Sequence, residues 1–514
     1  MVESSLPVLS LLVVLPLAGA IITFLLPRRL AVASRWVALV FSLVPLLLSL
    51  YLYVLVWTAP APTATPGYLS AESLHFEEDF EWVPSLGISY TLGVDGMSLP
   101  LVFLTALLSC LAIVFSWSES RRPKEYFGLM LVMEVGVAGV FMALDFFLFY
   151  IFWEVVLIPM YFLIGIWGGP RKDYSAIKFF IYTHVASVVM LLGIMGLYFQ
   201  CRDALGHATF SMVEMAKVAP TLAPGFQCAA FAALFFGFAV KMPSVPFHTW
   251  LPDAHVEAPT AGSVLLAGLL LKMGGYGLLR VAIPVLPAGA EAAVPVMVVL
   301  AVASIFYGAL LCIAQNDLKK MVAYSSISHM GFVMLGAATL SPIGISAGVF
   351  QMFNHGLVTA VLFMMCGVFH HSAGTREIGR LGGLAGKVPV AATVFLVGSL
   401  ASLGLPGLCS FISEFLVIYS AFVSFGAWMW IPVSAVVLTA AYYLWAAQRV
   451  LFGKFRVDLP ESERGRLEDL HISEAVALGV LIALIVLFGL FPSAVLDMVN
   501  PVSAAVGGLF GGVG

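Results

Sequence analysis

The chain has 514 residues, of which 61% are hydrophobic and only 10% are Asp, Glu, Lys or Arg. Soluble domains carry about 25% charged residues, so this composition excludes a soluble enzyme and a disordered chain. The formal net charge of -4 supplies no excess of basic residues, which excludes a nucleic-acid-binding protein.

A membrane-spanning helix needs about 20 apolar residues. The sequence contains fourteen such runs, and strands are expected to be nearly absent because open sheet edges cannot face lipid. The runs lie at 6–26, 34–57, 97–118, 126–144, 146–168, 175–199, 229–250, 260–283, 293–314, 318–339, 344–370, 389–425, 428–452 and 474–492. No basic segment precedes the first run, which favours a membrane helix over a signal peptide. The sequence therefore predicts an all-α polytopic membrane protein.

The distribution of basic residues predicts how the chain is oriented. With the N-terminus outside, 19 of the 24 Lys and Arg, Lys319 among them, lie in cytoplasmic connections, and three lie in outer connections, namely Arg202, Lys217 and Arg280. Both termini are then expected outside, because fourteen crossings return the chain to its starting side. The acidic segment 58–96 has no Lys or Arg and begins with a Pro/Ala/Thr-rich stretch, so we expect an outer loop there.

Two of the runs are interrupted by Pro and Gly. The seventh is broken at Met242-Pro243-Ser244-Val245-Pro246, and the twelfth at Leu403-Gly404-Leu405-Pro406-Gly407. The two runs are five helices apart and therefore cross in opposite directions. Paired broken helices in inverted repeats are typical of secondary transporters, in which the breaks mark the ion path. Pro and Gly are also common in ordinary membrane helices, but an ionisable residue beside each break favours the transporter interpretation.

Ionisable side chains occur inside the apolar runs, where a central charge costs about 2.5–3.5 kcal/mol on insertion scales. They are Glu134, Glu154, His184, Lys241, Lys272, His329, His355 and Glu414, with His248, Asp253 and His255 near the inner end of the seventh helix. Carboxylates, amines and imidazoles exchange protons, and their pKa values respond to burial and to nearby charge. Moving a carboxylate relative to a buried lysine would therefore load or unload a proton without a cofactor.

Several of these residues also have a structural interpretation. Glu134 and His184 could be polar contacts between helices. Asp253 and His255 could cap or solvate a connecting turn, and Asp145 could cap the helix that follows it. Proton transfer is the preferred interpretation for the lysines, because ionisable residues inside a membrane are functional by default.

Cysteine and glycine patterns give no sign of a bound group. No two of the six cysteines are closer than 27 residues, so zinc and iron–sulfur sites lack their usual spacing. No glycine motif for a nucleotide was found. We therefore expect no metal and no cofactor in this chain, and the cofactor of any redox chemistry would be held elsewhere.

The segment Lys241–Ser263, KMPSVPFHTWLPDAHVEAPTAGS, closely resembles the signature of the antiporter-like membrane subunits of respiratory complex I, the NADH:quinone oxidoreductases. Supporting segments are Trp153-Glu154, 271–280, 317–331, Asn354-His355 and 404–415. The resemblance covers nearly the whole chain. It is greatest to the M-type members, which is supported by the segment 95–99 and by Glu instead of Lys at position 414.

The resemblance implies fourteen helices that include two inverted five-helix repeats. Helices 1–3 with the acidic loop would then occupy 1–125, and the repeats 126–283 and 293–452. A cytoplasmic linker and the last helix would occupy 453–514.

The resemblance also implies a role for each candidate residue. It pairs Glu154 with Lys241 and makes Lys272 the central proton carrier. The remaining first-tier residues are His329 and His355 along the polar axis, Glu414 at the outward exit and His248 near the inner uptake side. Glu134, His184, Asp253 and His255 are second-tier candidates.

In this family FMN, iron–sulfur clusters and quinone are bound by partner subunits. The resemblance implies a bacterial inner-membrane location, with other membrane-arm subunits, especially the L-type and N-type paralogues, as partners beside the lipid bilayer. Three alternatives stay open at this point: an Mrp-type cation/proton antiporter subunit, a membrane subunit of a hydrogenase or formate-oxidising complex, and a structural spacer. Glu414 argues against the Mrp type, for which a lysine is expected.

Overall fold

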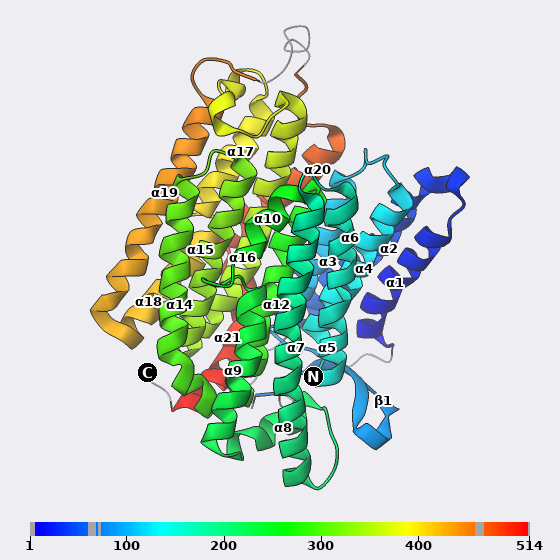
Figure 1. Cartoon of the computed structure of the whole chain (residues 1–514), viewed down its shortest axis with the longest axis vertical. Coiled ribbons are helices and arrows are strands. Elements are labelled where there is room, and N and C mark those ends of the chain that lie inside the picture. Colours follow the sequence, from blue (N-terminus) through cyan, green and yellow to red (C-terminus); the bar gives the residue numbers. More distant parts are fainter. Residues whose placement is uncertain (1–5, 60–67, 70–72, 458–466, 512–514) are drawn as a thin grey trace.

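The computed structural model describes residues 6–59, 68–69, 73–457 and 467–511. The expected outer-loop residues 60–67 and Glu72, and the expected cytoplasmic Arg464 and Arg466, lie outside these ranges. The chain is nearly all helical (Figure 1). The helices are α1 (Val8–Leu25), α2 (Ser34–Trp57), α3 (Leu99–Phe115), α4 (Pro123–Met142), α5 (Phe146–Val155), α6 (Leu157–Trp167), α7 (Lys172–Leu205), α8 (Met212–Val218), α9 (Pro224–Lys241), α10 (Trp250–Glu257), α11 (Thr260–Leu265), α12 (Leu271–Tyr276), α13 (Ile283–Val285), α14 (Pro287–Ile313), α15 (Leu318–Ala338), α16 (Pro342–Ala373), α17 (Pro389–Ser402), α18 (Cys409–Phe425), α19 (Trp430–Leu451), α20 (Ile472–Leu490) and α21 (Ser493–Gly507).

Helix occupies every one of the fourteen predicted apolar runs. Thirteen helical stretches of the described chain are long and apolar enough to cross a membrane, and α3 and α17 are shorter apolar helices. The predicted all-helical membrane fold is therefore confirmed. The sequence did not predict α21, which follows directly after the last predicted run.

Several helices begin at a residue whose side chain accepts hydrogen bonds from the first turn. Asp145 accepts from the N–H groups of Phe147 and Leu148, so the capping interpretation of this residue is confirmed. Asp317 and Ser341 cap α15 and α16 in the same way. These caps satisfy backbone donors that the helix itself leaves unpaired.

The two predicted breaks are present. α9 ends at Lys241 and α10 begins at Trp250, while α17 ends at Ser402 and α18 begins at Cys409. The second break contains Gly404 and Gly407 with φ of +77° and +92°, a backbone conformation that favours glycine. The eighth span has an unpredicted irregularity, because π-helical turns at Leu266–Leu270 and Gly277–Ala282 flank α12.

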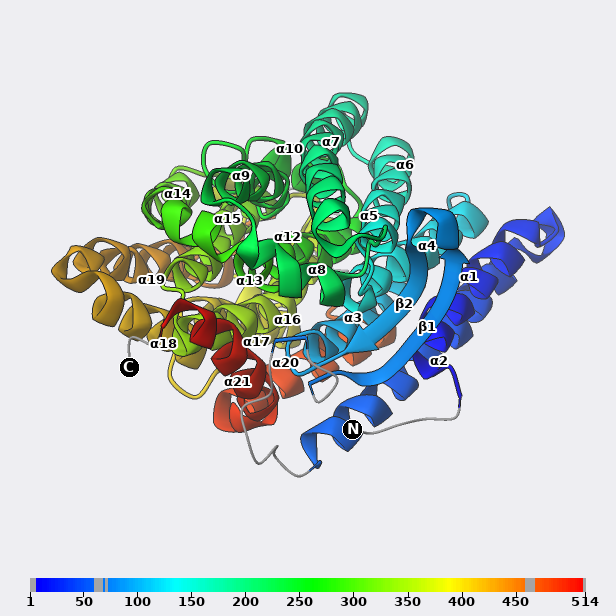
Figure 2. The same cartoon turned by 90° about the horizontal axis from the view of Figure 1, so that it is seen from below.

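The core lies in the middle of an elongated bundle (Figure 2). Within an apolar 18-residue window of each span, all residues of Thr260–Val285 and 94% of those of α15 and α16 are buried within the chain, compared with 28% for Arg29–Trp57, which contains α2, and 39% for α7. The polar residues of the site are thus concentrated on helices that other helices surround. The peripheral helices instead present their apolar side chains outward.

An antiparallel hairpin of β1 (His75–Val83) and β2 (Ile88–Val94) lies at one end of the bundle, which we call the hairpin end (Figure 1). The sequence predicted an outer loop over 58–96 but no strands within it, so the hairpin is an unpredicted feature of this connection. A short sheet is possible because its edges do not have to face lipid. Bridges join Leu92 to Ala143 and Asp145 to Ser211, which places the connections after α4 and α7 at this end.

The connections rich in Lys and Arg meet at the opposite end, which we call the basic end. Gly382 pairs with Arg456, and the Trp167 indole donates a hydrogen bond to the Arg121 carbonyl. Arg376 forms an ion pair with Asp317. The grouping of connections on two sides therefore agrees with the charge pattern, and the compartment that each end faces stays a prediction.

Candidate functional site

Lys272 lies at the centre of the bundle and is fully buried. Its ammonium nitrogen donates to the Ala267 carbonyl at 2.5 Å and lies 2.6 Å from Nδ1 of His355 on α16. Ala267 belongs to the first π-helical turn of the eighth span. The π turns are a common feature of functional sites in helices. This lysine therefore has one fixed backbone partner and one titratable partner.

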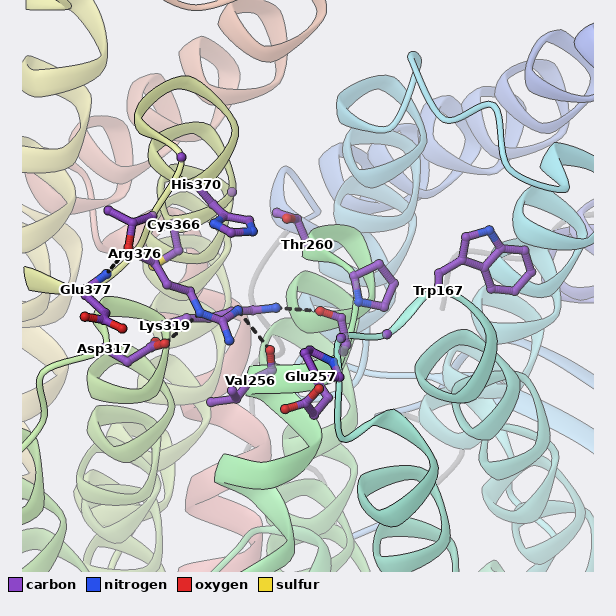
Figure 3. Close-up of a pocket in the computed structure, with 18 residues that line it drawn as sticks. Trp167, Val256, Glu257, Thr260, Asp317, Lys319, Cys366, His370, Arg376 and Glu377 are labelled. Carbon is purple, nitrogen blue, oxygen red and sulfur yellow. Dashed lines mark hydrogen bonds and ion pairs between the residues drawn. The ribbon is translucent and has the colours of Figure 1, made fainter. Parts of the chain in front are cut away.

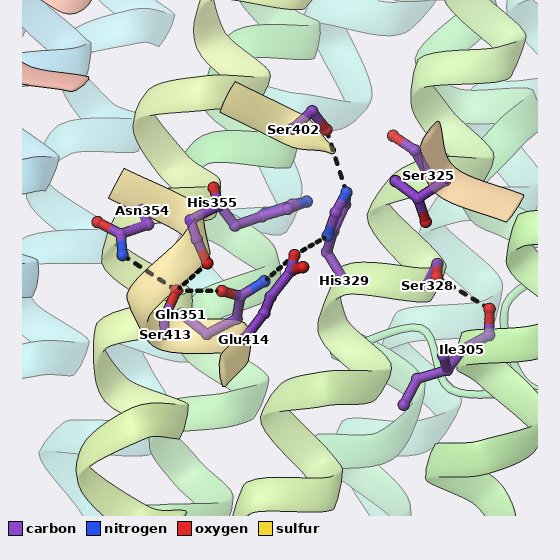
Figure 4. Close-up of polar contacts among 12 residues, drawn as sticks. Ile305, Ser325, Ser328, His329, Gln351, Asn354, His355, Ser402, Ser413 and Glu414 are labelled. Atoms are coloured by element: carbon purple, nitrogen blue, oxygen red, sulfur yellow. Dashed lines mark hydrogen bonds and ion pairs between the residues drawn. The ribbon is translucent and has the colours of Figure 1, made fainter. Parts of the chain in front are cut away.

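His355 leads toward a second titratable pair. The His355 and His329 rings lie 5.5 Å apart, and Nε2 of His355 has no hydrogen-bond partner. His329 on α15 contacts Glu414 Oε1 at 3.0 Å through Nδ1 and Ser402 Oγ at 3.1 Å through Nε2 (Figure 4). Glu414 and Ser402 lie on either side of the second helix break. The broken helix thus holds both ring nitrogens of His329.

A second set of polar side chains orients Glu414. Gln351 donates to Glu414 Oε1 at 3.3 Å and accepts from the Ser413 hydroxyl at 2.5 Å. Asn354 donates to Ser413 Oγ at 3.1 Å and to the Cys409 carbonyl at 2.8 Å (Figure 4). All of these groups are buried, so the network fixes the carboxylate without bulk water.

Glu154 and Lys241 lie beside the first break but do not contact one another directly. Glu154 Oε2 is instead 3.0 Å from Nδ1 of His184 on α7, and within the described part of the chain its Oε1 has no hydrogen-bond partner. The buried Lys241 ammonium is also without such a partner and lies 5.3 Å from the centre of the Trp153 ring. The resemblance pairs these two residues, and here their interaction is electrostatic through space.

The residues expected near the inner side of the seventh helix lie apart from one another. Asp253 forms ion pairs with Lys178 at 2.7 Å and with Arg171 at 3.3 Å, so it stabilises the connection at the basic end. His255 is fully buried against Phe363, and neither of its ring nitrogens has a hydrogen-bond partner among the residues that the structure describes. His248 packs edge-on against Tyr307, with an unpartnered Nδ1.

Glu134 on α4 is buried, and neither of its carboxylate oxygens has a hydrogen-bond partner in the described ranges. The structure does not connect it to the Lys272–Glu414 network by any direct contact among the described residues. Burial without a hydrogen-bond partner costs far less free energy for a neutral carboxyl group than for a charged carboxylate.

Sequence reasoning missed Lys319. It was counted only as a loop charge, yet its side chain is buried and donates to the Ala258 carbonyl at 2.5 Å. It lines a cavity of about 530 Å³ at the basic end, between the turns that precede α7 and α11, the start of α15 and the end of α16 (Figure 3). Arg376, Glu257 and His370 also line this cavity. The motif Asp317-Leu-Lys-Lys at the start of an apolar helix was the available signal.

Arg280 was assigned to an outer connection, but the structure buries it to 2% exposure, so that placement was wrong. It forms an ion pair with the buried Asp95, and its backbone carbonyl accepts from the Tyr68 hydroxyl. The second π turn places Arg280 inside the bundle near the hairpin end. A buried cation is tolerated there because an acidic partner is in contact.

Residues 143–439 match the model of a family described as NADH:quinone oxidoreductase/Mrp antiporter, TM. The chain belongs to this family. The matched range contains every first-tier candidate from Glu154 to Glu414, whereas Glu134 lies outside it.

Relatives of this antiporter family match almost the full chain. F420H2 dehydrogenase subunit M of Methanosarcina mazei is 43% identical over 514 residues, which cover 99% of this chain and 100% of that protein. NADH-quinone oxidoreductase subunit M of Escherichia coli is 38% identical over 492 residues, which cover 95% of each. The resemblance to M-type antiporter-like subunits is therefore confirmed.

Solved structures give the same result. A chain of respiratory complex I from Thermus thermophilus with bound NADH superposes with a TM-score of 0.85 at 30% identity, covering 98% of this chain and 100% of that one. A chain of the Mrp complex from Dietzia superposes with a TM-score of 0.83 at 22% identity, covering 98% and 97%. The second likeness shows a shared fold alone.

Proposed function

We propose that this chain moves protons across the membrane along its buried polar axis, driven by electron transfer in partner subunits. The observation that carries this proposal is the sequence of contacts from Lys272 through His355 and His329 to Glu414. Each member can bind and release a proton. Each is also costly to place inside apolar helices, and its presence there therefore indicates a function.

Uptake would begin at the cavity of the basic end. Lys319 faces this cavity, and the buried His255 interacts electrostatically with both Lys319 and Lys272. His255 is therefore coupled electrostatically both to a lysine of the cavity and to the central lysine. Its two unpartnered ring nitrogens leave it able to accept a proton on one side and to release it on the other.

Transfer along the axis would follow the observed hydrogen bonds. The Lys272 ammonium gives a proton to Nδ1 of His355 across 2.6 Å, which leaves a neutral amine and an imidazolium. His355 then passes a proton to His329 through a ring movement or a bridging water, since the ring centres are 5.5 Å apart. His329 delivers it to Glu414, from which it leaves toward the hairpin end.

Glu154 and Lys241 would control this transfer by changing the local field. Two unit charges 4 Å apart interact by about 4 kcal/mol at an effective dielectric constant of about 20, and doubling the distance removes about 2 kcal/mol. Moving one charge against 100 mV costs about 2.3 kcal/mol. A movement of the Glu154 carboxylate between His184 and Lys241 is therefore of the right size to drive a transfer step.

We further propose that the regions 126–283 and 293–452 are inverted repeats, with one broken helix in each. The partners would be other membrane-arm subunits, including L-type and N-type paralogues, which would leave FMN, iron–sulfur clusters and quinone outside this chain. Relatives carry the names of both an NADH and an F420H2 oxidoreductase, so either compound class is a candidate electron donor.

Lys272→Met in the assembled complex tests the proposal. Methionine fills the buried site but cannot carry a proton, so we expect loss of most proton translocation in liposomes containing a pH-sensitive dye. Lys217→Met, at an exposed lysine on α8, is the matched control and should translocate at the wild-type rate. Wild-type translocation by the assembled Lys272→Met complex would contradict the proposal.

A further inference from the structure

Three potential metal ligands meet where α16 ends and α20 begins. A ring nitrogen of His371, a ring nitrogen of His471 and a carboxylate oxygen of Glu474 all lie within 4.8 Å of one another. His371 belongs to the last turn of α16, whereas His471 directly precedes α20. None of these residues belongs to the proton-transfer axis described above.

The carboxylate of this cluster is held in place. Its side chain is only 7% exposed, and Oε2 accepts a hydrogen bond from the His471 backbone N–H at 3.0 Å. Oε1 therefore faces His371, whose Nε2 lies 2.8 Å away. The two imidazole rings are stacked with their centres 5.5 Å apart and are 43% and 54% exposed, so they are accessible from solution.

We propose that His371, His471 and Glu474 form a binding site for a divalent transition-metal ion of the Zn²⁺ class. Two imidazoles and one carboxylate are a common three-residue ligand set for zinc, with water in the fourth position. Zinc–ligand bonds of about 2.0–2.2 Å place tetrahedral ligand atoms about 3.4 Å apart. The His371–Glu474 pair, at 2.8 Å, would open slightly to reach that separation, whereas the other ligand pairs, which lie within 4.8 Å, would close toward it.

The site would connect two helices that the chain brings together only by folding. α16 carries Gln351, Asn354 and His355 of the polar axis, and α20 packs beside it. His370, the neighbour of His371, lines the cavity at the basic end. A bound ion would therefore restrain the end of α16 at the position where that helix borders the cavity.

The test is metal titration of the full chain purified in detergent and freed of metal with a chelator. Zn²⁺ binding is followed by calorimetry, and Co²⁺ binding by its absorption bands. We expect one site, whose Zn²⁺ affinity Glu474→Gln and His371→Ala each lower at least about tenfold. Losing a residue that only hydrogen bonds to a metal ligand already lowers metal affinity by about 10–100-fold. His471→Asn should lower the Zn²⁺ affinity similarly. Asparagine preserves the cap of α20, because its side-chain oxygen can accept from the Glu474 backbone N–H as the His471 ring does.

His207→Ala is the matched control, because His207 is an exposed histidine that contacts a single carboxylate, Glu214, at 3.3 Å. This variant should bind Zn²⁺ like the wild type. Unchanged affinity in the three ligand variants would overturn the proposal. A second measurement on the unaltered chain does not depend on whether the variants fold. Zn²⁺ should protect His371 and His471 from modification by diethyl pyrocarbonate. Equal modification with and without Zn²⁺ would also overturn the proposal.

Discussion

Glu414 uses one carboxylate oxygen to accept from two neighbours, His329 and Gln351, on different helices. A carboxylate in this position can exchange a proton with His329, whereas an amide of the same size can only hydrogen bond. Glu414 and His329 can therefore titrate, whereas neutral neighbours such as Gln351 only orient the carboxylate. This distinction decides which substitutions should stop translocation and which should only slow it.

Glu414→Gln should assemble normally but lose most proton translocation, because glutamine preserves the volume and cannot carry the proton. Glu414→Asp and Glu414→Lys should each retain part of the activity. Reconstituted complex with a pH-sensitive dye measures this, with Glu125→Gln at an exposed surface pair as the control. Full translocation by Glu414→Gln would reduce Glu414 to a structural contact.

Lys319→Met should reduce translocation by removing the only lysine that lines the cavity among the described residues. Its neighbour Lys320 is only partly buried, and Lys320→Met should leave the rate unchanged. Proton flux at saturating electron donor is the measurement. Equal flux in the two variants would exclude Lys319 from the uptake route.

At this scale the sequence predicts titratable residues well and their contacts poorly. Lys272, His329 and Glu414 stand out because a charge in an apolar run is unusual, and the structure brings them into one network. Gln351 and Ser413 carry no such signal, since neutral polar residues are ordinary in membrane helices. The contact of Glu154 with His184 also could not be predicted, because it depends on how α5 and α7 pack.

The broken helices are the elements that create space for this chemistry. A continuous α17–α18 helix would satisfy its own backbone and could not place Ser402 and Glu414 on opposite sides of His329. The breaks follow directly from Pro and Gly in the sequence, so they were predictable. The π turns on both sides of α12 were not, because mostly apolar residues with a single Gly in each turn are also common in continuous membrane helices.

Gly407→Ala should destabilise the chain by about 1–3 kcal/mol, since a Cβ is strained at φ of +92° even though the surrounding space is open. Gly386→Ala also meets open space but lacks the positive φ, so it should be nearly neutral. Thermal unfolding in detergent compares the two. Equal melting temperatures would show that the second break does not depend on glycine.

The whole molecule has two chemically different ends, with basic connections at one and the β hairpin at the other. The charge pattern predicted this division because basic residues are retained on the cytoplasmic side during insertion. It did not predict the hairpin or α21, since hydropathy detects spanning segments and says little about structure outside them. The charge pattern also did not predict that Arg280 is buried, because a basic residue near the end of an apolar run is normally exposed.

Alkaline phosphatase fused after residue 68 should be active, and fused near residue 122 it should be inactive, if the hairpin end faces outward. The enzyme folds only outside the cytoplasm, so activity reports the side of each fusion. The reverse pattern would invert the proposed direction of proton transfer.

The ion pair of Arg280 with Asp95 has a consequence for synthesis of the chain. Asp95 is made 185 residues before Arg280, and His329 is made 85 residues before Glu414. The later residue of each pair therefore enters the membrane when its partner is already present. Placing a lone charge in lipid is costly, so the order of synthesis spares Arg280 and Glu414 that cost and favours docking of each new helix onto those already inserted.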